Sequence, residues 1–218
     1  MSKFYSEQHR ALQDRFDSRR MADFLEGGHV HAEFAPDEAK FIGKCDMFFL
    51  STVDAAGRPT VSYKGGAEGF VKVTGPAELI FPSYDGNGMF YSMGNILVEP
   101  RIGLLFMDFE KPYRLRVQGS AKIDFEHERL PDYPGAQFIT TVAVESVWVN
   151  CSRYIHKYQK LATSKYVPKA GRDAPFPAWK RLDIVQGALP AKDQGKLAEI
   201  GGPITLEEYA EFAAKGEG

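Results

Sequence analysis

A series of short β-type segments between residues 47 and 149 constrains the fold of this chain more than any other feature. The segments are rich in β-branched and aromatic residues, and turns containing glycine or proline separate them. One helical stretch, Gly88 to Val98, interrupts the series. Strands with this spacing predict a small barrel rather than a parallel sheet. The expected strands are Met47–Val53, Thr60–Tyr63, Phe70–Val73, Glu78–Phe81, Arg101–Met107, Tyr113–Phe125 and Phe138–Val149.

Helical patterns flank the predicted strands on both sides. Apolar residues recur at helical spacing from Ser6 to Glu26, and the Gly27-Gly28 pair should end that helix. A second short helix is expected after Pro36, with acidic residues in its first turn.

The segment after Cys151 begins as a proline-containing loop and then becomes helical again. We expect helices near Ala178 to Gln186 and from Thr205 to Lys215. Thr205 and Glu208 have the spacing of a capping box.

Composition excludes several classes of protein. A net charge of -2 without a basic block argues against a nucleic-acid partner. No apolar stretch is long enough to cross a membrane, and the polar N-terminus does not look like a secretory signal. Two cysteines, Cys45 and Cys151, suit a reducing compartment, so we expect a cytoplasmic protein, although a disulfide between them stays open.

Four segments occur in an order that resembles a known family. They are FLSTVDAAGRPTVSYKGG (Phe49 to Gly66), GFVKV (Gly69 to Val73), NILVEPRIGLLF (Asn95 to Phe106) and LRVQGSAKI (Leu115 to Ile123). Together they resemble the FMN-binding split barrel of the pyridoxamine 5′-phosphate oxidase-like family. The segments NCSRYIHKY and PAWKR further along resemble a bacterial branch of that family with mostly unassigned substrates.

The resemblance implies a mainly β fold, a split β-barrel with an N-terminal helix and a C-terminal helical tail. It divides a single structural domain into a helical extension (1–45), a flavin-binding barrel core (46–150) and a loop and helical tail (151–218). It also implies a homodimer with FMN at the subunit interface. The expected activity is hydride transfer between the flavin and a small-molecule substrate or nicotinamide cofactor. The alternatives are a non-catalytic flavin carrier or sensor, and a barrel that binds deazaflavin or haem.

An FMN phosphate requires hydroxyls, backbone N–H groups and a cation. Two stretches offer these groups: the strand end Ser62 to Gly66 and the loop Pro82 to Gly88 before the predicted helix. In the pyridoxamine phosphate oxidases proper, an Arg stands at the position of Ser62 and an Arg-Lys pair at those of Tyr91 and Ser92. Phosphate binding must therefore depend on Lys64, Ser83, Asn87 and backbone groups. The expected cofactor contacts there are Ser62, Tyr63, Lys64, Gly65, Pro82, Ser83, Asn87 and Gly88.

Simpler interpretations of these stretches stay open. Lys64-Gly65-Gly66 also fits an ordinary solvated turn. Asn87 also fits a residue near a helix start whose side chain is satisfied by its own backbone.

Arg114 and Arg116 alternate with apolar residues, so both should point to the same face of a strand. By resemblance, Arg114 contacts the flavin ring of the neighbouring subunit, where an Arg would stabilise the reduced flavin. The alternative is a pair of surface arginines that bind Asp108, Glu110 or Asp124.

The resemblance places further flavin and substrate contacts after the last strand. Asn150 is expected to bind the cofactor, and Arg153 and Tyr154 to bind substrate. His156 is the candidate proton donor or acceptor, against the ordinary interpretation of a structural histidine in an aromatic-rich helix. We expect no metal site, because the pair His29 and His31 lacks further ligands at a suitable spacing.

Overall fold

The computed structural model describes residues 2, 4–172 and 174–216. The chain forms two compact units, Met1–Arg172 and Asp173–Gly218. This boundary falls within residues 151–218, which the sequence analysis treats as one tail. The division of a single domain into residues 1–45, 46–150 and 151–218 stays a prediction.

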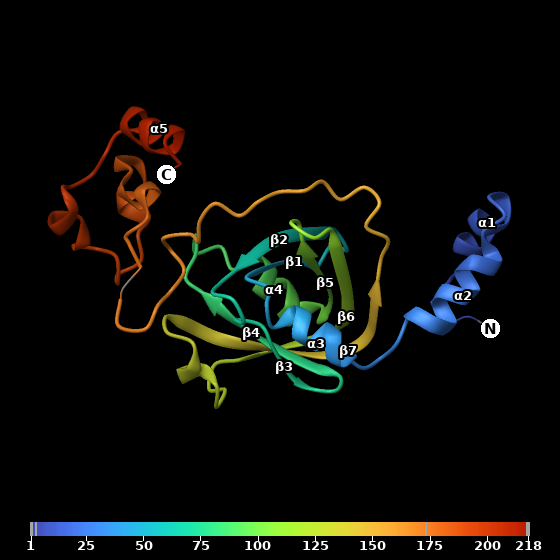
Figure 1. The fold of residues 1–218 in the computed structure, drawn as a ribbon. Coiled ribbons are helices and arrows are strands. Elements are labelled where there is room, and N and C mark those ends of the chain that lie inside the picture. The colour runs from blue at the N-terminus through green and yellow to red at the C-terminus, as the bar shows by residue number, and fades with distance from the viewer. Residues whose placement is uncertain (1, 3, 173, 217–218) are drawn as a thin grey trace. The chain divides into compact units, whose positions relative to one another are not determined.

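The first unit contains a seven-stranded antiparallel sheet with the order β2-β1-β5-β6-β7-β4-β3. The sheet curls back on itself (Figure 1). The predicted fold class, mainly β with helical additions, is confirmed. The strands are β1 (Met47–Val53), β2 (Pro59–Gly65), β3 (Lys72–Gly75), β4 (Glu78–Tyr84), β5 (Arg101–Asp108), β6 (Tyr113–Asp124) and β7 (Ala136–Val149).

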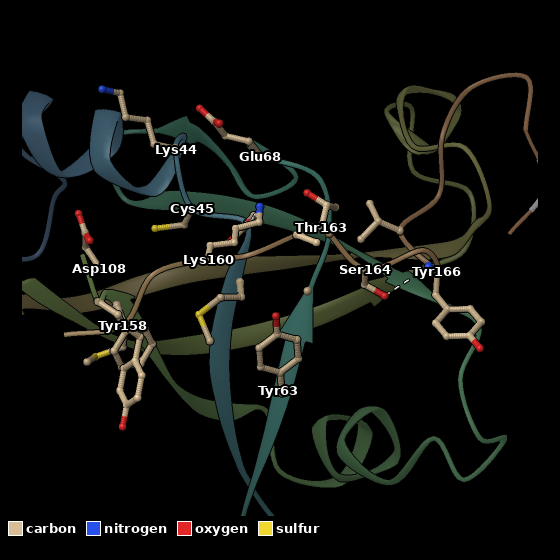
Figure 2. A pocket seen from close by; sticks show the side chains of 18 of the residues that line it. Lys44, Cys45, Tyr63, Glu68, Asp108, Tyr158, Lys160, Thr163, Ser164 and Tyr166 are labelled. Carbon is tan, nitrogen blue, oxygen red and sulfur yellow. Dashed lines mark hydrogen bonds and ion pairs between the residues drawn. The ribbon is translucent and has the colours of Figure 1, made fainter. Parts of the chain in front are cut away.

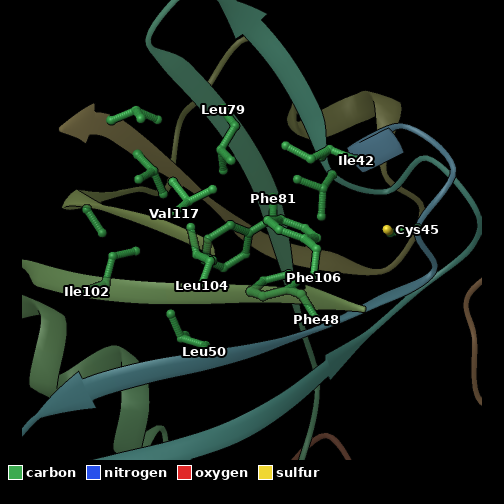
Figure 3. Packing of buried hydrophobic residues seen from close by; sticks show 14 of the residues in the cluster. Ile42, Cys45, Phe48, Leu50, Leu79, Phe81, Ile102, Leu104, Phe106 and Val117 are labelled. Carbon is green, nitrogen blue, oxygen red and sulfur yellow. The ribbon is translucent and has the colours of Figure 1, made fainter. Parts of the chain in front are cut away.

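The strand alternation places one face of the sheet in the core. Phe48 of β1 is fully buried and packs edge-on against Phe81 of β4 at 5.0 Å between ring centroids. Phe106 and Val117, from β5 and β6, fill the space beside them (Figure 3). Burial of each such side chain contributes about 1.5–3 kcal/mol, so this core holds the curled sheet together.

The N-terminal helical region differs from its prediction. The expected single helix is two helices, α1 (Glu7–Arg15) and α2 (Arg19–His29). Asp17 lies between them with a φ of 49°, a left-handed conformation that no helix can continue through. Gly27 and Gly28 lie within α2 and do not end it. The short helix α3 (Pro36–Ile42) forms where Pro36 predicts it.

The internal helix α4 (Tyr91–Val98) does not begin at Gly88 as predicted. Gly88 has a φ of 79° and Phe90, the residue before the helix, a φ of 48°. Both are left-handed, so the loop stays irregular until Tyr91. β4 is longer than predicted, and Ser83 and Tyr84 therefore lie on a strand.

The remaining short elements are η1 (Leu130–Asp132) in the first unit and four helices in the second. The predicted helix from Ala178 to Gln186 is two 3₁₀ helices, η2 (Ala178–Arg181) and η3 (Asp183–Ala188). They are followed by η4 (Lys196–Ile200) and α5 (Leu206–Ala214). The capping box is confirmed, because the Thr205 hydroxyl accepts the Glu208 N–H at 3.2 Å. None of the helices described is long and apolar enough to span a membrane.

Candidate functional site

A small cavity of about 230 Å³ lies between β2, the end of β4 and the start of α4; we call it the anion pocket. Five of the predicted cofactor residues line it, from the two stretches that the sequence analysis selects. The residues that line it are Ser62, Lys64, Ser83, Tyr84, Gly86, Asn87, Gly88, Met89, Phe90, Tyr91, Ser92 and Met93.

The alternation of β2 explains which side chains enter the anion pocket. Ser62 and Lys64 lie on the face of β2 toward α4, and the Ser92 hydroxyl donates to the Ser62 hydroxyl at 3.0 Å. Tyr63 points to the opposite face and lies edge-on to the ring of Phe49. The lining of the pocket thus contains hydroxyls from a strand and from a helix, together with one ammonium.

Lys64 carries the positive charge of the anion pocket. Its side chain is partly buried, and this burial lowers its pKa. Among the described residues, no carboxylate pairs with it. A partly buried ammonium without a counter-charge is unfavourable, and an anion in the pocket would compensate it.

The loop before α4 is held by its own turn. The Asn87 side-chain oxygen accepts the Met89 N–H at 3.0 Å, in agreement with the simpler interpretation of that residue. The left-handed residues Gly88 and Phe90 lie on either side of Met89 in this loop.

Two contacts that the sequence analysis did not foresee fix α4 on the β1–β2 hairpin. The Tyr91 hydroxyl donates to the Asp54 carboxylate at 3.2 Å, and the Asn95 amide donates to the Thr52 hydroxyl at 3.1 Å. Hydrogen bonds from the Arg58 backbone, its side chain and Tyr91 hold the pKa of Asp54 below its usual value. Tyr91 and Ser92 stand where the pyridoxamine phosphate oxidases proper have an Arg-Lys pair. Here both side chains instead form hydrogen bonds to the β1–β2 hairpin.

The other predicted site residues lie elsewhere. Pro82 is buried in β4 beside Ser83, and Tyr63 and Gly65 line a larger cavity of about 810 Å³. This larger cavity, which we call the cleft, lies against residues 158–168 (Figure 2). The sequence offered no signal for it, because residues 158–168 have no periodic pattern.

Arg114 lies on the outer face of β6, and its Nε is buried without a hydrogen-bond partner in the described part of the chain. It makes no ion pair with Asp108, Glu110 or Asp124 there. Arg116, on the same face, lines a groove of about 710 Å³ over β1, β5 and β6. The expected common face of the two arginines agrees with the strand pairing.

The candidates after β7 are not gathered into these cavities. Asn150 donates its N–H to the Arg114 carbonyl at 3.4 Å. Arg153, Tyr154 and His156 are exposed and line none of the three cavities. The helix expected around His156 does not form, since residues 151–164 contain neither helix nor strand.

The described residues contain no group of three or more His, Cys, Asp or Glu side chains that could hold a metal ion. His31 instead pairs with Glu38, with 2.8 Å between its Nε2 and the carboxylate. Cys45 is buried and Cys151 exposed, and both are free thiols.

Comparisons with known proteins identify one family and several similar structures. The family model described as pyridoxamine 5′-phosphate oxidase matches residues 34–147, and no curated protein matches. Similar solved structures include HupZ of Group A Streptococcus, at 18% identity over 53% of this chain and 93% of that one, with a TM-score of 0.43. An FMN-binding protein from Syntrophomonas wolfei matches at 11% identity over 65% and 96%, with a TM-score of 0.39. HutZ, the haem storage protein from Vibrio cholerae, matches at 17% over 54% and 94%, also with a TM-score of 0.39.

The family model covers α3, the whole strand series through most of β7, and the anion pocket between them. The chain belongs to the pyridoxamine 5′-phosphate oxidase-like family of FMN-binding split barrels.

Proposed function

We propose that this protein binds FMN, with the phosphate in the anion pocket, and that it is a flavin-dependent oxidoreductase acting on a small molecule. The observation that carries the proposal is the partly buried Lys64 ammonium, which has no carboxylate partner among the described residues. A phosphate would supply the missing charge, and the Ser62, Ser83 and Ser92 hydroxyls would supply hydrogen bonds.

The dimensions of the pocket fit the phosphate end of the cofactor. Sites for whole drug-sized ligands enclose roughly 300–1,000 Å³, and the anion pocket is smaller, at about 230 Å³. The ring system must therefore lie outside it. FMN supplies the redox chemistry when bound, and the residues of this chain bind its phosphate and orient it.

We propose that a second copy of the chain completes the site. The groove over β1, β5 and β6 includes Val61, which is 66% exposed, and Trp148. These apolar side chains, set among the charged residues Glu99, Arg101, Arg116 and Glu145, suit a self-complementary contact between two chains. The unpaired Arg114 Nε on the same sheet face would then gain a partner across the dimer. We also propose a cytoplasmic location, which the use of only two cysteines suggests.

Mass spectrometry of the ligand released from purified native protein decides between FMN, deazaflavin and haem. We expect FMN, at one per chain, and a yellow protein with twice the chain mass in solution. Turnover of NADPH or pyridoxamine phosphate would support an enzyme, and binding of FMN without turnover of any tested donor would support a carrier or sensor. A colourless monomer that does not bind added FMN would overturn the proposal.

The substitution Lys64→Ala tests the pocket itself. We expect it to weaken FMN binding by about 1.5–3 kcal/mol, the range for hydrogen bonds to charged groups. Titration of apoprotein with FMN, followed by flavin fluorescence, measures the change. Lys122→Ala is the control, because Lys122 is an exposed strand lysine outside the pocket. Equal FMN affinity in both variants would remove Lys64 from the site.

A further inference from the structure

The cleft has a wall that does not come from the barrel. Residues 158–168, which we call the strap, run along the barrel end after β7. The Tyr158 N–H donates to the Phe109 carbonyl at 3.2 Å, and the two rings meet edge-on at 5.5 Å. At its other end, Pro168 packs beside Gly135. The strap and the barrel together enclose about 810 Å³, within the range of small-molecule sites.

The lining of the cleft is aromatic. Rings come from α3, β2, β4, the β5–β6 turn and the strap, so flat faces are presented from several directions. Tyr84 also lines the anion pocket, which makes the two cavities neighbours. The aromatic residues are Phe41, Tyr63, Tyr84, Phe109, Tyr158 and Tyr166.

The charges in the lining are mostly negative. The cleft is lined by the acidic residues Asp46, Glu68, Asp85, Asp108 and Glu110 and by the basic residues Lys44 and Lys160. The anion pocket next to the cleft has the opposite character, with Lys64 and no carboxylate in its lining.

A cation of the chain itself already occupies the cleft. The Lys160 ammonium, from the strap, forms an ion pair with the Asp46 carboxylate at the start of β1. Figure 2 shows Lys160 directed into the cleft near Cys45 and Tyr63. The Asp46 hydrogen bond, with a smaller contribution from Glu68, raises the pKa of Lys160. This contact shows that the cleft accommodates a positive charge beside a carboxylate. The aromatic rings of the lining would add the flat faces that organic cations prefer.

We propose that the cleft is the substrate chamber and takes a small flat molecule with a positive charge, which binds by displacing the Lys160 ammonium from Asp46. That this ligand is a substrate rests on the proposed flavin function, whereas its chemical class is inferred from the cleft alone. The pair that must break is exposed, and such pairs stabilise little, so the displacement costs little.

Calorimetric titration of the full chain with three probes of similar shape tests the ligand class. The probes are the N-methylnicotinamide cation, neutral nicotinamide and anionic nicotinate. We expect the cation to bind most tightly and nicotinate most weakly. Glu68→Gln should weaken binding of the cation about two- to fivefold, and Lys160→Met should tighten it by a similar factor, because these are the factors for one exposed ion pair. Lys157→Met is the matched control, since it removes the same charge from a neighbouring exposed residue outside the cleft.

Equal affinity for the three probes, preference for nicotinate, or identical effects of Lys160→Met and Lys157→Met would overturn the inference. The titrations are run on apoprotein and on FMN-loaded protein. Discrimination of the cation in protein that fails to bind FMN would reject the flavin proposal and leave the cation site standing. Normal FMN binding without discrimination would reject the cation site alone.

Discussion

Lys64 shows how one residue can change the character of an otherwise ordinary turn. Its neighbours Gly65 and Gly66 suggest a solvated turn, and the strand continues through Gly65. The strand alternation turns the lysine toward α4, where burial disfavours its charged form. In this position the residue is unfavourable without a ligand, which is a common property of binding sites.

The lowered pKa of Lys64 predicts the pH dependence of FMN binding. A bound phosphate favours the charged ammonium, so the pKa of Lys64 should rise in the complex toward its ordinary value. FMN affinity should be highest at pH values below the pKa that Lys64 has in the free protein. It should fall as the pH rises from that value to the pKa that Lys64 has in the complex. Fluorescence titrations between neutral and alkaline pH measure this. Lys64→Arg, which keeps its charge, should abolish the alkaline loss, and an unchanged profile in that variant would contradict the assignment.

At the scale of elements, the anion pocket depends on how α4 is docked. Tyr91, Ser92 and Asn95 each bind a different residue of the β1–β2 hairpin. The helix start and β2 are therefore positioned relative to each other by side chains rather than by the backbone. This docking brings two stretches that are distant in sequence to one cavity.

The contact between β6 and β7 also depends on a single glycine. The register of the pair shifts between Gln118 and Gly119, and a Cβ at Gly119 would overlap the Ala143 carbonyl oxygen of β7. We expect Gly119→Ala to destabilise the protein by about 1–3 kcal/mol, since backbone cannot yield as a side chain does. Gly103→Ala is the control, because its Cβ would lie 3.7 Å from the Ser51 side chain. Urea unfolding compares the two variants, and equal midpoints would contradict the packing argument.

The strands could be predicted because they follow from local patterns, and two stretches chosen with the help of the family resemblance do meet in one cavity. Alternating burial reveals strands such as β1, and the family resemblance identified the stretches around Lys64 and Ser83. The start of α4 could not be predicted, because nothing in the sequence reveals that Phe90 adopts a left-handed conformation. The cleft could not be predicted either, since its strap is held by contacts between residues distant in sequence, such as Lys160 with Asp46.

At the scale of the whole molecule, the chain is two compact units. The larger unit contains the sheet, the anion pocket and the cleft. The smaller one has its own buried ion pair, Lys180 with Asp193 at 2.8 Å. No described residue of the smaller unit lines the anion pocket or the cleft.

This division predicts where a protease cuts first. Lys169 and Arg172 are exposed at the end of the larger unit, next to the boundary. Limited trypsin digestion should cleave there before it cleaves the hairpins of the sheet, because local opening is easiest where few contacts cross. Mass spectrometry of early products should find the larger unit intact. First cleavage within the β1–β2 hairpin, at Arg58, would contradict the division.

β2 is the terminal strand in the order of the sheet, and the same strand supplies Ser62 and Lys64 to the anion pocket. It also supplies Val61 to the groove that we propose as the contact with a second chain. Self-association through this groove and occupancy of the pocket would then be thermodynamically linked, each favouring the other by the same free energy. The apparent strength of ligand capture would in that case rise with protein concentration, so dilution alone would release the ligand.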